Sequence, residues 1–428
     1  MRFLAPLSLL ITCAMAPSSL GTDSSPEPPP AAPTQPNSPA PPPNTVSVAS
    51  TQGLLEVHNV RNLDDLLDPI RITHRVPALG CAVIVSNRLA GLGAVGLRKS
   101  DDPSAPVTPD DRWHHGSLTK SMTATLAAIL VQRGVLQWES TLEELFPSLA
   151  PSMKPAWRSV RLDWLCSNRS GAPGDLGAGG LWLELVRFQG TPFEGRRRLL
   201  ERLTQTDPVH TPGTAYEYSN AGFALAGHML ETATGKPWET LMTENLFQPL
   251  GMTSAGFGAP GKPGQLNQPW GHQRLGDRNV PIEPGPSADN PPAIGPAGTM
   301  HGSLLDLSQY AAFHLRGHRA DTPMLTREAM VRLHTAVPGN EGYGGGWIVT
   351  TRPWANGLVL THSGSNRQWY SVLWLAPERQ FAVAATCNVA APSGPNPGAA
   401  ATEQVVSTLI RTFLPQERPG SGPPPTPQ

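Results

Sequence analysis

The hydrophobic pattern places strands near both ends of the chain and helices between them. Gly80 to Val85 is a continuous apolar run typical of a buried strand, and Leu92 to Gly96 follows it as a hairpin partner. Strands at both ends with helices between them predict an α/β (α+β) fold, with an antiparallel five-stranded sheet built from both ends of the chain and flanked by helices. The strand-like runs in the C-terminal part are residues 343–349, 358–362, 369–376 and 381–388.

Helical spacing of apolar residues fills the region between these strands. Leu54 to Arg75 and Met122 to Val135 carry apolar residues three and four positions apart. Thr141 and Ser303 each stand three residues before an acidic residue, which is the arrangement of a capping box at a helix start. Residues 255–297 are rich in Gly and Pro and have no period, which indicates a long loop. Further helices are expected at residues 181–205, 221–235, 238–247, 303–315 and 399–413.

These elements indicate one large domain over residues 53–414. Its sheet parts are expected at about residues 76–116 and 340–414. The inserted, mainly helical part is expected at about residues 136–300. A chain of this length is sufficient for such a domain and its core.

The N-terminal segment has the pattern of an export signal. A basic residue precedes an apolar stretch that is too short to span a membrane, so residues 1–21 are expected to be a signal peptide. Cys13 ends a stretch that loosely resembles a lipoprotein cleavage box, and cleavage after Gly21 is the alternative; both stay open. Residues 22–52 are dense in proline and residues 415–428 have the same character, so a disordered linker and tail are expected. The expected location is the periplasm or cell envelope, with a membrane tether if Cys13 is lipidated.

Composition excludes several classes of partner and cofactor. Charged residues make up 15% of the 428 residues and the net charge is -1, so nucleic acid is not expected as a partner. Three of the four cysteines remain if Cys13 is set aside, which allows at most one internal disulfide, and no spacing suggests zinc. His314 and His318 have metal-like spacing but no acidic third ligand between them. We therefore expect no metal and no other cofactor.

Ser117 and Lys120 are the first candidates for chemistry. Residues 110–116 lack a helical period and end in glycine, so Ser117 is expected to open a helix with Lys120 one turn later on the same face. Unpaired N–H groups at a helix start favour an oxyanion, and burial of a lysine lowers its pKa so that it can act as a base. The alternative is a helix-capping serine and a surface lysine. Lysine is scarce in this chain and cations are disfavoured at a helix N-terminus, which favours the catalytic interpretation.

Other motifs follow this pair in an ordered series. Tyr218-Ser219-Asn220 and then His362-Ser363-Gly364 stand downstream of Ser117-x-x-Lys120. Over about residues 54–414 the series resembles the serine β-lactamase and penicillin-binding-protein superfamily, most closely its class C-like branch of β-lactamase-related serine hydrolases. The supporting matches are Pro212-Gly213-Thr214, Pro249-Leu250-Gly251-Met252, Pro296-Ala297-Gly298-Thr299-Met300 and Gly344-Gly345-Gly346-Trp347.

The resemblance implies a site of seven residues. Ser117 would attack a carbonyl, with Lys120 and Tyr218 sharing the proton transfers, and which of the two is the base stays open. Backbone N–H groups of Ser117 and Ser365 would form the oxyanion hole. Asn220 would hydrogen-bond the substrate or Lys120, with a helix cap as its alternative role. The catalytic candidates are Ser117, Lys120 and Tyr218, and the substrate-binding candidates are Asn220, His362, Gly364 and Ser365.

The chain departs from the family pattern at two places. Ser167-Asn168-Arg169-Ser170-Gly171 stands where relatives often read His-Thr-Ser-Gly, which indicates a reshaped loop. The third motif begins with His362 rather than the lysine of many β-lactamases, and a histidine is mostly neutral at pH 7. This predicts weak β-lactam turnover, better activity on neutral acyl donors, and improved activity on carboxylate-bearing donors below about pH 6. Arg367, five residues on, is an alternative source of the missing charge.

Two classes of function stay open at this point. The first is an exported serine hydrolase that forms an acyl-enzyme on Ser117 with an ester, a D-amino acid peptide or a β-lactam. The second is a catalytically silent protein of the same fold that binds cell-wall peptidoglycan. Retention of Ser117, Lys120 and Tyr218 together favours the enzyme.

The resemblance also bears on two cysteines. In the family's sheet the first strand neighbours the last and runs antiparallel to it. That arrangement would bring Cys81 and Cys387 close enough to allow a disulfide without requiring one.

Overall fold

The computed structural model describes residues 45–46, 54–177, 179–337 and 342–414. The expected signal peptide, Cys13 and the C-terminal tail lie outside these residues, as does most of the expected linker. Within the linker range, Thr45–Val46 form strand β1, which pairs with β2.

A nine-stranded sheet lies at the centre of the described residues, in the order β1-β2-β4-β3-β14-β13-β12-β11-β10. Its N-terminal and C-terminal halves join where β3 pairs antiparallel with β14, with Val83 opposite Val383. The predicted sheet from both ends of the chain is therefore confirmed. The other strands of this sheet are β2 (Val60–Asn62), β3 (Ala78–Val85), β4 (Arg88–Gly96), β10 (Tyr343–Gly344), β11 (Trp347–Arg352), β12 (Gly357–Ser365), β13 (Tyr370–Ala376) and β14 (Phe381–Cys387).

The sheet differs from the prediction in its strand count and in one pairing. It has nine strands among the described residues rather than five, and β2 runs parallel to β4, whereas all other neighbours are antiparallel. Gly345 and Gly346, with φ of 47° and 77°, turn the predicted run 343–349 into two strands, β10 and β11. The added strands β1 and β2, at one side of the sheet, are two and three residues long, too short to show a period in the sequence.

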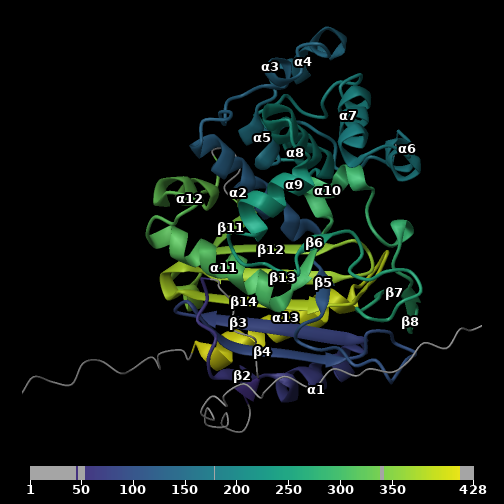
Figure 1. Cartoon of the computed structure of the whole chain (residues 1–428), viewed down its shortest axis with the longest axis vertical. Helices are drawn as coiled ribbons and strands as arrows, with labels where there is room; N and C mark the ends of the chain where they lie inside the picture. Colours follow the sequence, from purple (N-terminus) through teal and green to yellow (C-terminus); the bar gives the residue numbers. More distant parts are fainter. Residues whose placement is uncertain (1–44, 47–53, 178, 338–341, 415–428) are drawn as a thin grey trace, which may run out of the picture. The chain divides into compact units, whose positions relative to one another are not determined.

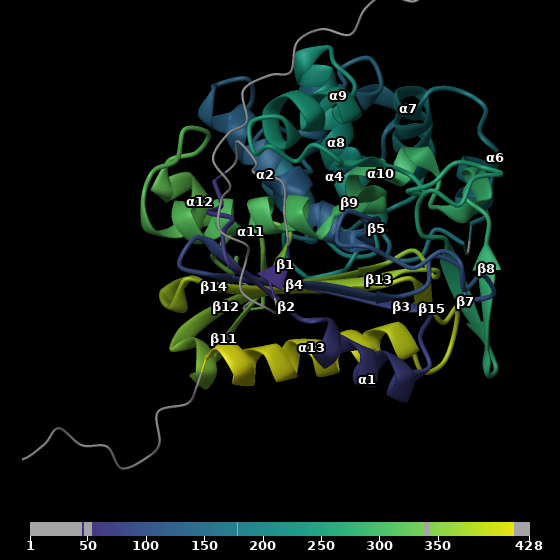
Figure 2. The same cartoon turned by 60° about the horizontal axis from the view of Figure 1, so that its bottom comes forward.

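Helices cover both faces of this sheet (Figures 1 and 2). Helices α1 and α13 lie together on one face, and the larger group that includes α2, α8 and α11 lies on the other. Each face of the sheet has its own hydrophobic core, and alternate residues of β14 point into one or the other. Val383 lies in the core that holds Val405 of α13, and Ala384 lies in the core that holds Met122 of α2. The helices are α1 (Asp64–His74), α2 (Thr119–Gln132), α3 (Leu142–Leu145), α4 (Pro155–Arg158), α5 (Leu162–Cys166), α6 (Leu181–Arg187), α7 (Pro192–Leu203), α8 (Asn220–Thr234), α9 (Trp238–Met242), α10 (Gly295–Gly298), α11 (Leu304–Arg319), α12 (Arg327–Leu333) and α13 (Pro397–Phe413).

Two predicted helices are shorter than the apolar spacing suggested. The helix expected from Leu54 begins only at Asp64, because the Asn62 side chain accepts the Asp64 N–H at 2.7 Å and ends the preceding strand there. The helix expected over residues 181–205 is two helices, α6 and α7. The second starts afresh at a capping box, in which Thr191 accepts the backbone N–H of Glu194. The capping boxes predicted at Thr141 and Ser303 are confirmed.

The region predicted as a loop, residues 255–297, contains a hairpin. Strands β7 (Gly271–Leu275) and β8 (Arg278–Ile282) pair antiparallel, and β15 (Val389–Ala390) extends them into a small sheet. A second small sheet joins β5 (Arg112–His114), β9 (Met300–Ser303) and β6 (Gly256–Phe257). This second sheet places the end of the Gly/Pro-rich region beside the segment that leads to Ser117.

The three described cysteines are buried and free. Cys81 lies opposite Ala385 and Cys387 lies opposite Leu79 on the paired strands β3 and β14. The strand adjacency expected from the resemblance is correct, but the two cysteines are offset by two positions in register. Diagonal neighbours at this offset are about 7–8 Å apart, too far for a strain-free disulfide.

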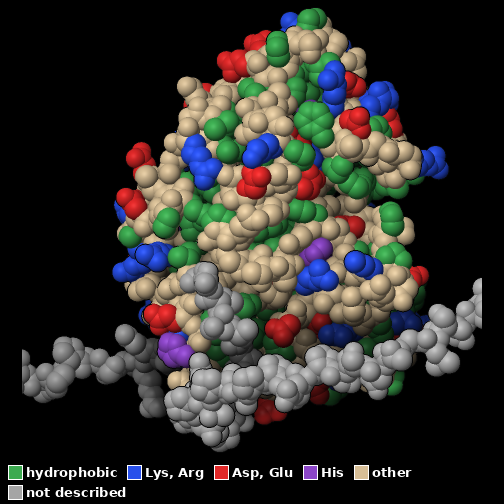
Figure 3. All heavy atoms as spheres, viewed as in Figure 1, with side chains coloured by type: hydrophobic (Ala, Val, Ile, Leu, Met, Phe, Trp, Pro, Cys, Tyr) green, Lys and Arg blue, Asp and Glu red, His purple; other side chains and the backbone are tan. Residues whose placement is uncertain are grey.

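The surface carries charges of both signs. On the face shown in Figure 3, Lys and Arg side chains are interspersed with Asp and Glu side chains. No helix in the described part of the chain is long and apolar enough to cross a bilayer.

Candidate active site

Ser117 lies in a single 3-10 turn, Gly116–Leu118, that runs directly into α2. The α-helix begins at Thr119, and its N-cap position is Leu118, which makes no side-chain capping bond. The expected helix start is therefore displaced by one short turn, and the alternative of a capping role for Ser117 is wrong. Its half-buried hydroxyl instead accepts a hydrogen bond from Lys120 Nζ at 3.1 Å.

Two glycines let this turn pack against strand β12. Gly116 has φ of 51°, and a Cβ there would overlap the backbone nitrogen of Ser365. A Cβ on Gly364 would overlap the carbonyl oxygen of His115 and the backbone nitrogen of Ser117. Only glycine permits such an approach. The N–H groups of Ser117 and Ser365, expected to form the oxyanion hole, are thus carried by two segments in direct contact.

Lys120 is fully buried, and its amino group is surrounded by oxygen atoms. Besides Ser117 Oγ, Nζ donates to Asn220 Oδ1 at 2.7 Å and to the carbonyl oxygen of Ala297 at 2.8 Å. Burial holds the pKa of Lys120 well below its ordinary value. A neutral amine close to a serine hydroxyl is the arrangement required for a general base.

Tyr218 and Asn220 reach this lysine from the start of α8. The ring of Tyr218 lies with its centroid 4.6 Å from Lys120 Nζ. Burial raises the pKa of Tyr218, an effect that its hydrogen bond to Ser117 partly offsets, so the phenol keeps its proton at neutral pH. Ser219, rather than Asn220, caps α8 by accepting the Gly222 N–H at 3.1 Å. The amide of Asn220 is thereby left to bind Lys120, one of the two roles expected for it.

His362 is buried next to the Tyr218 ring and is not among the described residues that line the cleft beside the site. The ring is buried, with Nδ1 2.6 Å from the Ser363 carbonyl oxygen and Nε2 3.3 Å from the Tyr343 hydroxyl. Burial, together with the nearby Lys120, lowers the pKa of His362 to about 3. The expectation that His362 becomes cationic below about pH 6 is therefore wrong. Both ring nitrogens already have protein partners, so the ring has no free atom for a substrate carboxylate.

A cleft of about 890 Å³ opens beside these residues. Asn220, Ser365 and the exposed Arg367 line it, whereas Ser117, Lys120 and Tyr218 are not among its described lining residues. The other side carries Trp182 and Phe188, from α6 and the segment after it. Two of the predicted site residues, Asn220 and Ser365, therefore face a space of the size that small-molecule ligands occupy.

Comparison with known proteins identifies the family. The Beta-lactamase family model matches residues 61–406, most of the chain. The chain belongs to the beta-lactamase family. As a member of this family it is a serine hydrolase, which agrees with the motif order in its sequence.

Relatives with a known name or structure match most of this chain at low sequence identity. "Penicillin-binding protein 4" of Amycolatopsis lactamdurans is 26% identical over 321 residues, covering 72% of this chain and 80% of the relative. The octameric penicillin-binding protein homologue from Pyrococcus abyssi matches with a TM-score of 0.65 at 24% identity, over 82% of this chain and 78% of that one. The D-amino acid amidase from Ochrobactrum anthropi SV3 matches with a TM-score of 0.63 at 20% identity, over 82% and 96% of the two chains. At these identities the two structures support the fold alone.

Two residues of this beta-lactamase-family site escaped the sequence analysis. Asn168 holds the Tyr218 segment, because its Oδ1 accepts the Ser219 N–H at 3.1 Å and its carbonyl accepts the Glu217 N–H at 2.8 Å. Tyr343 is buried and its hydroxyl contacts His362. The only signal for Asn168 was its place in the loop that departs from the family pattern, and Tyr343 had no local signal.

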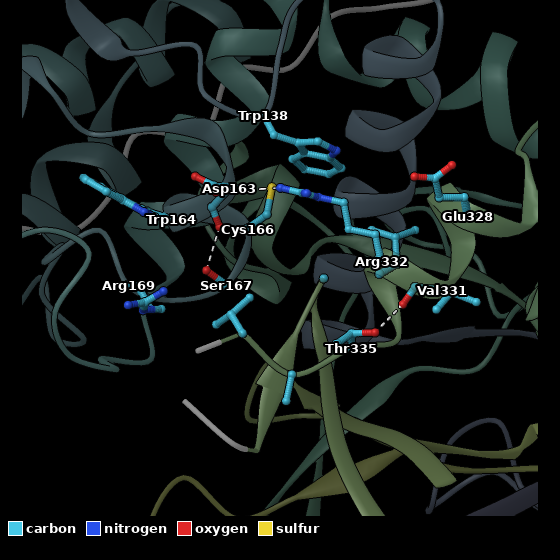
Figure 4. Close-up of a pocket in the computed structure, with 14 residues that line it drawn as sticks. Trp138, Asp163, Trp164, Cys166, Ser167, Arg169, Glu328, Val331, Arg332 and Thr335 are labelled. Carbon is cyan, nitrogen blue, oxygen red and sulfur yellow. Dashed lines mark hydrogen bonds and ion pairs between the residues drawn. The ribbon is translucent and has the colours of Figure 1, made fainter. Parts of the chain in front are cut away.

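A second hollow, of about 390 Å³, lies away from the site residues (Figure 4). Arg332 lies over the ring of Trp138 at 5.1 Å from its centroid, and Arg161 pairs with Asp163 at 2.8 Å. The side chain of Ser167 donates to the Asp163 carbonyl oxygen at 2.6 Å. Among the charged residues that line this hollow, Arg332 also lies 3.8 Å from Asp163, and no predicted catalytic residue lines it.

The histidines with metal-like spacing have another arrangement. His314 Nδ1 lies 2.8 Å from His334 Nε2, and His318 Nδ1 lies 3.0 Å from His334 Nδ1. Among the residues that the structure describes, no group of three His, Cys, Asp or Glu side chains is placed to hold a metal ion. The three rings instead form a hydrogen-bonded row between α11 and α12.

Proposed function

We propose that this chain is an exported serine hydrolase that forms an acyl-enzyme on Ser117, with an ester, a D-amino acid peptide or a β-lactam as acyl donor. The observation that carries the proposal is the position of Lys120 Nζ, 3.1 Å from Ser117 Oγ, in a buried setting that lowers its pKa. Family membership and the name of the Amycolatopsis lactamdurans relative support the same class of substrate. Export rests on the pattern of residues 1–21 alone.

In the proposed acylation step, Ser117 Oγ attacks the carbonyl carbon while its proton passes to Lys120 Nζ. The resulting oxyanion would accept hydrogen bonds from the N–H groups of Ser117 and Ser365. The bond from the carbonyl carbon to the leaving nitrogen or oxygen then breaks, and that atom takes a proton from Tyr218, which Lys120 replenishes. The raised pKa of Tyr218 fits a proton donor, and the lowered pKa of Lys120 fits a base.

In the deacylation step, water attacks the acyl-enzyme carbonyl carbon and gives up a proton to the same pair. Ser117 Oγ then leaves and regains its proton. Asn220 would hold Lys120 in place during both steps, because its Oδ1 already accepts a hydrogen bond from Nζ.

Covalent labelling of Ser117 tests this function. We expect a fluorophosphonate probe and a penicillin each to add one label to the wild-type protein, detected by intact mass and located by peptide mapping. Ser117→Ala should take up none, and Ser121→Ala, which alters a buried serine on the same helix, serves as the matched control that keeps the label on Ser117. Equal labelling of wild type and Ser117→Ala would refute the nucleophile, and absence of any label would favour the silent peptidoglycan-binding protein.

A further inference from the structure

The turn that carries Ser117 is held by the side chain of His114. His114 lies in strand β5 and is fully buried. Its Nδ1 accepts the Gly116 N–H at 3.1 Å, so this nitrogen carries no proton. The ring proton is therefore on Nε2, which lies 2.8 Å from Asp289 Oδ1. The ring thus connects the backbone beside the nucleophile to a carboxylate that is far away in the sequence.

Asp289 also contacts the second half of the expected oxyanion hole. Its Oδ1 accepts a hydrogen bond from Asn366 Nδ2 at 3.1 Å, and Asn366 directly follows Ser365 at the end of β12. The side chain of Asp289 is 5% exposed, and its Oδ2 is buried without a hydrogen-bond partner among the described residues. A buried oxygen without a donor lowers stability, so the stability of the fold does not by itself account for an acid at this place.

The residue after Asp289 extends the connection toward Lys120. Asn290 Nδ2 donates to the carbonyl oxygen of Gly298 at 2.8 Å. Gly298 lies in α10 next to Ala297, whose carbonyl oxygen accepts from Lys120 Nζ at 2.8 Å. Asp289 and Asn290 lie outside helices and strands, so side-chain contacts rather than a backbone ladder join this segment to the site.

We propose that Asp289 and His114 are positioning residues for acylation, which together hold the two N–H groups of the oxyanion hole at a fixed separation. One carboxylate oxygen reaches the turn of Ser117 through His114 and the end of β12 through Asn366. Both residues act through the backbone groups that they hold, and a misplacement of about 1 Å in such a site can lower a rate by about 100-fold. This inference rests on the proposed function and names the residues that support its oxyanion hole.

Substitutions at the two residues test the inference on the acylation step alone. With enzyme in excess, the release of p-nitrophenol from p-nitrophenyl butyrate reports acylation of Ser117 at any rate of deacylation. Asp289→Ala removes the carboxylate, and Asp289→Asn keeps the accepting oxygen. His114→Asn keeps a side-chain acceptor in the place of Nδ1 but cannot reach the carboxylate. Asp277→Ala and His58→Asn, at an exposed acid and an exposed histidine, are the matched controls.

We expect Asp289→Ala and His114→Asn each to lower the limiting acylation rate by about 10- to 100-fold, because the N–H groups act on the transition state. The half-saturating ester concentration should stay nearly unchanged. Asp289→Asn and the two controls should acylate at close to the wild-type rate. The double variant of Asp289→Ala and His114→Asn should lose no more than Asp289→Ala alone, because His114 acts through Asp289.

Wild-type acylation rates in Asp289→Ala and His114→Asn would overturn the inference, as would a double variant in which the two losses multiply. A loss confined to the half-saturating concentration would also overturn it and would assign Asp289, which lines the cleft, to substrate binding. Urea unfolding checks that each variant is folded in the assay, and if Asp289→Ala does not fold, His114→Asn decides the result. Equal release of p-nitrophenol by wild type and Ser117→Ala would instead overturn the proposed function and the inference with it.

Discussion

At the scale of single residues, the surroundings of Lys120 determine its chemistry. Its Nζ lies within hydrogen-bond distance of three oxygens, those of Ser117, Asn220 and Ala297, and none of them belongs to a carboxylate. Without a negative partner, burial dominates and favours the neutral amine. The same ammonium on the surface would keep its proton at neutral pH and could not accept one from serine.

We predict that the acylation rate rises with pH and levels off well below pH 10.5, because the titrating group is the amine of Lys120 with its lowered pKa. Lys120→Met should reduce acylation by about 100- to 10,000-fold and remove this pH dependence. Stopped-flow acylation with a chromogenic ester across pH 5–10 measures both. Lys154→Met, at a half-exposed lysine, should behave as wild type. A Lys120→Met enzyme with near wild-type rates would assign the base elsewhere.

At the scale of elements, the site depends on contact between the Gly116–Leu118 turn and strand β12. Gly364 lies in an ordinary strand conformation, so its requirement for glycine is purely one of space. The carbonyl of His115 and the nitrogen of Ser117 occupy the volume where a side chain would begin. Because both obstacles are backbone atoms, no side-chain rotation can relieve the overlap.

Gly364→Ala should therefore push β12 away from the turn, separate the two oxyanion N–H groups and lower acylation strongly. The free energy of unfolding should fall by about 1–3 kcal/mol, as for other overpacking substitutions. Gly179→Ala is the control, since a Cβ there meets nothing within 4 Å. Urea unfolding and acylation kinetics on the three proteins check both effects. Wild-type acylation in Gly364→Ala would show that this contact does not position the nucleophile.

At the scale of the whole molecule, the sequence predicted short motifs better than it predicted contacts between segments far apart in the chain. The motif residues Ser117, Lys120 and Tyr218 were found because short spacings along the chain carry them. The Ala297 carbonyl that accepts from Lys120 and the Asn168 side chain that holds Ser219 come from segments far away in sequence. The spacing of apolar residues along the chain does not reveal such contacts, because these segments meet only when the chain folds.

The same distinction explains the errors about secondary structure. The helix expected over residues 181–205 is interrupted at Thr191, where a capping box marks a new start that the apolar spacing concealed. The burial of His362 was equally hidden. His362 lies on β12, and the hydroxyl that contacts it belongs to Tyr343 on β10, with β11 between the two strands. The presence of a histidine suggested a group that changes charge near neutral pH, but burial in the folded chain lowers the pKa of His362.

The row of His314, His334 and His318 makes stability depend on pH for the whole molecule. Burial is the main cause that lowers the pKa of each, to about 3 for His314, and the neighbouring rings lower the pKa of His314 and His334 further. Glu378 faces His318 at 3.8 Å and acts in the opposite direction, whereas Arg319 and Arg327 act in the same direction as burial. The unfolded chain therefore binds protons below about pH 6.5 that the folded chain does not.

We predict that the free energy of unfolding falls as pH decreases from about 6.5 toward 4. His334→Leu should make this slope shallower by up to about 1.4 kcal/mol per pH unit, because one buried histidine no longer takes up a proton on unfolding. The slope is the readout, since removing the ring also lowers stability at every pH. His58→Asn, at an exposed histidine, should leave the slope unchanged. Urea unfolding at half-unit steps from pH 4 to 8 measures it, and an identical slope in wild type and His334→Leu would show that His334 is already protonated in the folded protein.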